Sequence, residues 1–206
     1  MAIEFDAEKH IYVKDGIVTP SVTQILDILS YEEFGKIDRS TLDYASRRGT
    51  AVHECTEAID LDMPCEVDTE IEPYVRAYLD FLHDYKPKWD RVEEIVSCLD
   101  DNYSFCGTID RTGYFGDRYV IVDIKTSTPS RLTYIKVCLQ TYLYNLCIPE
   151  HADMWVLFLK KDGTYNLINC EEWWKKNVSK PLYSAVYELL DAYKLIQEIK
   201  TKGKKK

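Results

Sequence analysis

The fold is decided by the stretch GTIDRTGYFGDRYVIVDIK, residues 107–125. Two runs rich in β-branched and aromatic residues flank a short turn at Gly116-Asp117, a composition typical of a β-hairpin. We expect strands over Tyr103–Phe115 and Arg118–Ile124. These strands form the centre of a sheet from which the remaining elements can be placed.

Each expected strand carries one carboxylate near the end of its apolar segment, Asp110 in the first and Asp123 in the second. Lys125 lies two residues after Asp123, and side chains two apart on a strand share a face. If the strands are antiparallel neighbours, the two acids lie close together. Two carboxylates and an ammonium at a strand end predict a divalent-metal site that acts on phosphodiesters.

Outward from this hairpin, strand and helix patterns intermix rather than alternate strictly. This favours an α/β fold with a central mixed β-sheet, an antiparallel meander and flanking helices. The expected sheet strands are Val92–Leu99, Tyr103–Phe115, Arg118–Ile124 and Met154–Leu159. The expected helices are about 50 to 63, 71–90, 131–146 and 171–200, the last with a break at Pro181.

Smaller signals complete the pattern. Residues 3–18 alternate around Asp15-Gly16 and residues 152–170 around Asp162-Gly163, and each predicts a hairpin. A chain of 206 residues without an evident linker favours one domain over 1–206, with its core at about 47–170. The basic tail, 200–206, is expected to be disordered.

Composition limits the class of protein. No apolar run approaches the roughly 18 residues of a membrane span, and the start lacks a secretory pattern. We therefore expect a cytoplasmic protein without a membrane partner. The net charge is −9, but residues 51–101 hold 15 acidic and 4 basic residues, so positive surface can exist elsewhere. The seven cysteines contain no CxxC pair, which suggests neither zinc nor a disulfide framework, and most are expected to be reduced and buried.

An early helix contributes a histidine. The run RRGTAVHE predicts a helix from about Thr50, with Gly49 at its entry, and His53 on one of its faces. Arg47 and Arg48 would then precede the helix, where an anion such as a phosphate binds well. The alternative is a structural histidine beside two solvated arginines.

Phosphodiester hydrolysis needs charge neutralisation on the phosphate and an activated water. Oxygen-liganded Mg²⁺ or Mn²⁺ supplies most of this, and Asp110 and Asp123 are suitable ligands. Lys125 can orient or deprotonate the water and stabilise the developing negative charge.

Taken together, these motifs resemble the PD-(D/E)xK nuclease superfamily. The similarity is greatest to the branch with RecB-type nuclease domains, lambda-type exonucleases and small phage exonucleases, which share a restriction-endonuclease-like core. Four elements match in order between residues 47 and 144, with Asp123 in place of the commoner glutamate. They are GTxxH (Gly49, Thr50, His53), Gxx-Asp (Gly107, Asp110), acid-x-Lys (Asp123, Lys125) and QxxxY (Gln140, Tyr144).

The resemblance implies roles for individual residues. Metal ligands would be Asp110, Asp123, the backbone carbonyl of Ile124 and His53. Lys125 would act on the nucleophilic water, while Gln140 and Tyr144 would position the lysine or a DNA phosphate. Some members add a glutamate from the preceding strand; Glu94 is the first candidate and Glu93 the second, the alternative being a solvated surface acid. DNA contacts are expected from Arg47, Arg48, Thr126 and Ser127.

One difference from the family pattern separates this chain from the iron–sulfur members of the branch. Those members close their cluster with a late group of cysteines, whereas only Cys170 follows Cys147 here. We therefore expect Mg²⁺ or Mn²⁺ and no iron–sulfur cluster. No GxxxxGK[ST] loop is present, so any unwinding would come from a partner such as a helicase; a single-strand annealing protein is the other partner considered.

The sequence thus favours a metal-dependent DNA exonuclease that resects ends for recombination, replication or repair in a bacterial or phage-infected cell. Two alternatives remain open. One is a non-catalytic DNA-binding module of the same fold, against which the intact Asp110, Asp123 and Lys125 argue. The other is a structure-specific endonuclease, over which the GTxxH and QxxxY elements favour the exonuclease.

Overall fold

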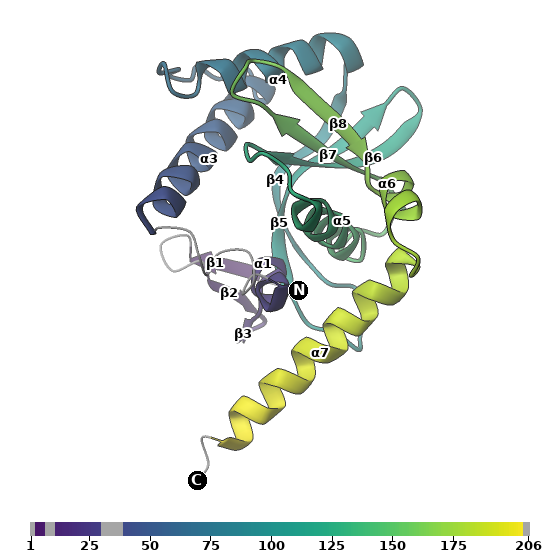
Figure 1. Cartoon of the computed structure of the whole chain (residues 1–206). Coiled ribbons are helices and arrows are strands. Elements are labelled where there is room, and N and C mark those ends of the chain that lie inside the picture. The colour runs from purple at the N-terminus through teal and green to yellow at the C-terminus, as the bar shows by residue number, and fades with distance from the viewer. Residues whose placement is uncertain (1–2, 7–10, 30–38, 204–206) are drawn as a thin grey trace.

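The computed structural model describes residues 3–6, 11–29 and 39–203. Two sheets organise these residues (Figure 1). A small antiparallel sheet contains β1 (Ile3–Asp6), β2 (Ile11–Lys14) and β3 (Ile17–Thr19). The expected hairpin at Asp15-Gly16 joins β2 to β3 and is confirmed.

The larger sheet has five strands in the order of the chain. They are β4 (Lys88–Ser97), β5 (Cys106–Phe115), β6 (Arg118–Lys125), β7 (Asp153–Leu159) and β8 (Tyr165–Asn169). All neighbours are antiparallel except β6 and β7, which are parallel and are connected through helix α5 (Arg131–Asn145). The predicted α/β class, with its mixed sheet and antiparallel meander, is confirmed.

Helices cover both faces of this sheet and create two hydrophobic cores. Helices α3 (Arg39–Asp60) and α4 (Glu72–Tyr85) cover one face. Helix α5 covers the other together with α1 (Val22–Leu26), α6 (Cys170–Asn177) and α7 (Leu182–Gly203). Because side chains alternate along a strand, β6 sends Val120, Val122 and Ile124 to the first core and Ile121 to the second.

The start of α3 differs from the prediction. The helix begins at Arg39, so Gly49 lies inside it and Arg47 and Arg48 do not precede it. A glycine within a helix destabilises it by only about 1 kcal/mol relative to alanine. Good helix formers on both sides, among them Arg48 and Ala51, are sufficient to carry the helix through this position.

The boundary between α4 and β4 was also placed wrongly by the sequence pattern. The helix expected over 71–90 ends at Tyr85, where Lys86 takes a left-handed conformation with φ 47° and Pro87 follows. Strand β4 then begins at Lys88 rather than Val92. Proline at this point prevents the helix from continuing.

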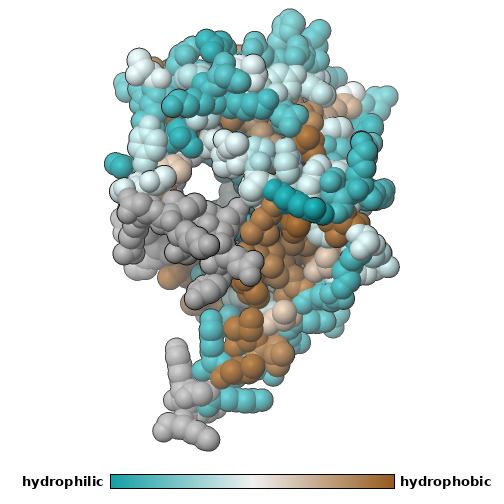
Figure 2. Space-filling view, in the orientation of Figure 1, coloured by the Kyte–Doolittle hydropathy of each residue, from teal (hydrophilic) through white to brown (hydrophobic). Residues whose placement is uncertain are grey.

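The C-terminal region forms two helices, as the break at Pro181 predicts. Helix α7 continues to Gly203, so the expectation of disorder from Lys200 is wrong for residues 200–203, while 204–206 lie outside the described residues. The last turns of α7 extend away from the sheets, and Figure 2 shows hydrophobic surface on this part of the molecule. Leu195 and Ile199 of α7 are exposed.

The cysteines divide into two groups. Cys55 at α3 and Cys65 in the following segment form one disulfide, which the cysteine spacing did not predict. The remaining cysteines are free and buried, as expected: Cys98, Cys106, Cys138, Cys147 and Cys170. Within the described residues, no helix has the length and apolar character that a membrane crossing requires.

Candidate metal and phosphodiester site

Strands β5 and β6 separate at the point where the two predicted acids lie. Their pairing reaches Arg111 opposite Val122, so the next step in this register places Asp110 beside Asp123. Beyond that step β5 continues along β4, and β6 continues along β7. Asp110 Oδ2 accepts a hydrogen bond of 2.7 Å from the backbone N–H of Ile124, which bridges the separating strands. We call this point the fork.

Asp123 and Lys125 form a pair at the fork. The ammonium donates to Asp123 Oδ1 at 2.9 Å and lies 2.7 Å from Oδ2. The Asp123 side chain is 1% exposed, and burial raises its pKa to about 6. Burial opposes the charge on Lys125, but the Asp123 and Asp110 carboxylates outweigh it and raise the lysine's pKa. Lys125 is therefore held as an ammonium beside Asp123.

Helix α3 delivers His53 to the same place. Its Nε2–H donates to the carbonyl oxygen of Ile124 at 3.1 Å, while Nδ1 lies 3.6 Å from Glu93 Oε1 and 3.8 Å from Asp110 Oδ2. Burial disfavours the charged imidazole, but the carboxylates of Asp110 and Glu93 prevail and raise the pKa of His53. His53, on helix α3, thus faces two acids that belong to the sheet.

The glutamate at this position is Glu93. His53, Glu93 and Asp110 each offer one ligand atom, and these atoms lie within 4.8 Å of one another. Glu94, the first candidate from the sequence, instead pairs with Arg91 at 3.0 Å, and the prediction that it joins the group is corrected. Glu93 has φ 50°, a left-handed conformation within a strand, so the usual alternation of faces could not decide between the two.

Gln140 and Tyr144 approach the fork from α5. Gln140 Nε2 donates to the Tyr144 hydroxyl at 3.3 Å. Tyr144 is buried, and burial together with the nearby Asp123 and Asp110 carboxylates raises its pKa. A Cβ at Gly107 would lie 2.7 Å from Tyr144 Cε1, so the glycine of the Gxx-Asp pattern is needed for this ring to pack on β5.

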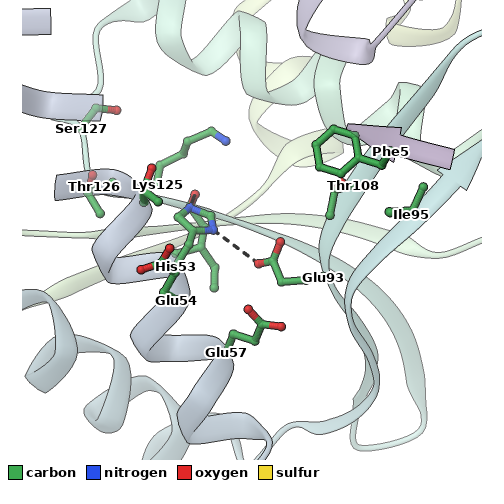
Figure 3. Close-up of a pocket in the computed structure, with 13 residues that line it drawn as sticks. Phe5, His53, Glu54, Glu57, Glu93, Ile95, Thr108, Lys125, Thr126 and Ser127 are labelled. Carbon is green, nitrogen blue, oxygen red and sulfur yellow. Dashed lines mark hydrogen bonds and ion pairs between the residues drawn. The ribbon is translucent and has the colours of Figure 1, made fainter. Parts of the chain in front are cut away.

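Two clefts open beside these groups. The first cleft has a volume of about 750 Å³, and its lining includes Gly49, Thr50, His53, Glu93, Lys125 and Ser127. Figure 3 shows His53 and Glu93 directed toward one another within it. The second cleft, of about 670 Å³, shares Lys125 and Ser127 and adds Gln140.

The loop residues after Lys125, which the sequence predicts as DNA contacts, lie at the walls of these clefts. Thr126 lines the first cleft and Ser127 lines both. Among the described residues, neither lining includes Asp110 or Asp123, which lie behind the side chains they contact, His53 and Lys125. Lys125 therefore connects the buried acids with both clefts.

Arg47 and Arg48 do not join this group. At 100° per residue, Arg48 lies on roughly the opposite side of α3 from His53. Its guanidinium lies 5.8 Å from the Tyr44 ring and 5.3 Å from the Tyr74 ring, and both arginines line a separate hollow with Asp68 and Glu70. The helix-start position from which an anion site was expected does not apply to them, because both arginines lie inside α3.

The chemistry of the donor set fits a hard divalent cation. Carboxylate oxygens with one imidazole suit Mg²⁺ or Mn²⁺. Asp123 Oδ2 is buried and has no hydrogen-bond partner within the described part of the chain, although an ammonium lies near it. An acceptor of this kind is suited to a positively charged ligand.

No protein-family model and no curated protein sequence matches this chain. Among solved structures, the chain is similar to SSO0001, with 13% identity, a TM-score of 0.41 and coverage of 87% of this chain and 76% of that one. It is also similar to an alkaline exonuclease, LHK-Exo from Laribacter hongkongensis, with 14% identity, a TM-score of 0.38 and coverage of 89% and 94%. Similarity at this level does not indicate a function.

Proposed function

We propose that this protein is a divalent-metal-dependent deoxyribonuclease that hydrolyses phosphodiester bonds from DNA ends. One observation carries the proposal: Asp110, Asp123 and Lys125 meet at the fork, and His53 and Glu93 complete the group from two other elements. Two clefts meet at Lys125, which gives a phosphodiester access to the same place.

The ligands are supplied by four parts of the fold. His53, Glu93, Asp110 and Asp123 would hold the cation, and the carbonyl of Ile124, already in contact with His53, is the remaining oxygen donor. When bound, Mg²⁺ or Mn²⁺ supplies Lewis-acid stabilisation of the negative charge that develops on the phosphate.

Lys125 has the second role. Its ammonium is fixed by Asp123 and remains 27% exposed at the junction of the clefts. From there it orients the attacking water and stabilises negative charge as the phosphate becomes pentacovalent.

Gln140 and Tyr144 support Lys125 from α5, since Gln140 lines the second cleft with the lysine and donates to the tyrosine. Thr126 and Ser127 follow Lys125 directly and would contact DNA phosphates through their hydroxyls and backbone N–H groups. The preference for DNA ends rests on the GTxxH and QxxxY resemblance.

The decisive experiment is digestion of end-labelled DNA with Mg²⁺ or Mn²⁺, using matched linear and covalently closed circular substrates. We expect shortening of the linear DNA from an end, intact circles and complete inhibition by EDTA. Equal cutting of circles would identify an endonuclease. Folded protein that binds DNA without cutting it under either metal would identify a binding module.

A further inference from the structure

Arg111 is fully buried, although it carries a charge that is almost never buried without partners. It follows Asp110 directly on β5 and belongs to none of the roles described above. Its guanidinium donates in three directions. Nε donates to Asp60 Oδ2 at 2.5 Å, Nη2 to Thr56 Oγ1 at 3.2 Å, and Nη1 to Glu93 Oε1 at 3.0 Å and to the Asp110 carbonyl at 2.7 Å.

Asp60 is fixed in turn. Besides Arg111, it accepts a hydrogen bond of 2.6 Å from the Tyr78 hydroxyl and one of 3.1 Å from Trp89 Nε1. The carboxylate is therefore held from α4 and β4 while it lies at the end of α3. It orients the guanidinium from the side away from the cation ligands.

Glu93 is the residue on which this arrangement acts. Its left-handed backbone conformation, with φ 50°, is rare for a side chain other than glycine and persists only where surrounding contacts enforce it. The oxygen that Arg111 holds, Oε1, is the same oxygen that lies 3.6 Å from His53 Nδ1. Arg111 thus holds the glutamate oxygen that faces the histidine.

The charges are balanced for a divalent cation. The connected group contains four carboxylates, on Asp60, Glu93, Asp110 and Asp123, and two cations, Arg111 and Lys125. Four negative charges and two positive ones leave a formal charge of −2. Without Arg111, Glu93 and Asp110 would face one another with one counterion fewer.

We propose that Arg111 is a positioning residue that acts through Glu93 to preorganise the cation site, and that Asp60 sets the orientation of Arg111. This inference rests on the proposed function only in that the site holds a divalent cation. Partners behind metal ligands typically contribute roughly 10- to 100-fold to metal affinity or activity.

The test is a double-mutant cycle read out as Mn²⁺ affinity by electron paramagnetic resonance, without DNA. Arg111→Lys keeps the positive charge but loses the planar set of N–H donors that reaches Asp60, Thr56 and Glu93 together. We expect it to weaken Mn²⁺ binding by roughly 10- to 100-fold. In a Glu93→Gln background, Arg111→Lys should have little further effect. Arg118→Lys, on an exposed arginine that pairs with Asp153, is the matched control and should bind as wild type.

Two results overturn the proposal: an Arg111→Lys variant with wild-type Mn²⁺ affinity, or the same loss of affinity with and without the Glu93 carboxylate. If Arg111→Lys does not fold by circular dichroism, Asp60→Asn with Arg111→Met removes both buried charges together, and the same cycle applies. Wild-type protein that binds Mn²⁺ without cutting DNA refutes the nuclease alone, and the cycle still decides the role of Arg111. Absence of Mn²⁺ binding by wild type refutes both.

Discussion

Lys125 lies where the two clefts meet, and its ammonium is fixed on a buried carboxylate. Lys125→Ala is expected to lower the cleavage rate by roughly 10²- to 10³-fold, because it removes a preorganised charge from the phosphate. Mn²⁺ and DNA binding should remain within a few-fold of wild type. Single-turnover cleavage and fluorescence anisotropy measure the two properties.

Lys136→Ala serves as the control for this prediction, because Lys136 lines the second cleft while Lys125 is the lysine paired with Asp123. It changes the charge of the cleft and should retain most of the cleavage rate. Equal losses in the two variants would reduce Lys125 to a general source of positive charge.

Two residues at the fork make cation binding sensitive to pH. Burial raises the pKa of Asp123 to about 6, and the carboxylates near His53 raise its pKa despite burial. Both groups must lose their protons to bind a cation, so protons compete with the metal as pH falls. We expect Mn²⁺ affinity to fall as the pH drops through the raised pKa of His53, and to fall more steeply below about pH 6, where Asp123 also takes up a proton. Titration from pH 8 to pH 5 measures it, and a flat profile would refute the assignment.

Some residues of the site can be identified from the sequence alone, and others cannot. Asp110, Asp123 and Lys125 could be selected because acids and a lysine at the end of apolar strands are unusual. Glu93 could not be chosen over Glu94, since its left-handed backbone breaks the alternation on which such a choice depends. Arg111 directly follows Asp110 in the sequence, but nothing in the sequence shows that its partners are Asp60 and Glu93.

At the scale of elements, Gly107 controls how α5 packs on β5. An added Cβ would lie 2.7 Å from a rigid ring carbon of Tyr144 and 3.2 Å from Val22 Cγ2. Gly107→Ala should therefore destabilise the protein by about 1–3 kcal/mol, as overpacking of a core typically does. Urea unfolding measures the stability, and the cleavage rate should fall as well because Tyr144 moves. Unchanged stability would mean that the ring relaxes freely.

Gly49 offers the opposite case. It lies inside α3, and a Cβ there would meet only Thr126 Oγ1 at an ordinary 3.8 Å among the described residues. Gly49→Ala is therefore expected to stabilise the protein by about 0.5–1 kcal/mol, because alanine favours the helix and restricts the unfolded chain. The Tm should rise by about 2–4 °C for each kcal/mol of added stability, which thermal unfolding measures. A decrease would indicate that the helix does not pass through this residue in solution.

The sequence predicts which helices and strands exist better than it predicts the residues at which they begin and end. The hairpins at Asp15-Gly16 and Asp162-Gly163 and the break at Pro181 follow from local turn chemistry, which the sequence contains. The start of α3 and the end of α4 depend on packing against the sheet. For this reason Gly49 was mistaken for a helix entry and residues 86–90 for helix.

At the scale of the whole molecule, the proposed cation site is made by α3, β4, β5 and β6 together, and the unfolded chain has no such site. Mn²⁺ at 100 times its Kd should therefore stabilise the protein by about 2.7 kcal/mol. This corresponds to a rise in Tm of about 5–10 °C for a chain of this size. Differential scanning fluorimetry with Mn²⁺ and with EDTA measures it, and Asp110→Asn should lose most of the shift. A Tm indifferent to Mn²⁺ would exclude a cation site at the fork.

The arrangement in space was predicted in outline only. The mixed sheet and its meander follow from the order of strands and helices, and the sheet's division into two cores follows from alternation along β6. The distance between α3 and the fork does not, because it depends on contacts between residues far apart in the chain. His53 could be expected at the site only through the family resemblance.

The fork between β5 and β6 has a consequence for how activity arises during synthesis of the chain. One acid belongs to the half of the sheet that pairs with β4, and the other to the half that is completed by β7, about 30 residues later. A nascent chain that ends before β7 holds Asp123 on a strand whose parallel neighbour has not yet been made. The proposed cation site, and with it the proposed nuclease activity, can therefore form only when both halves of the sheet are present.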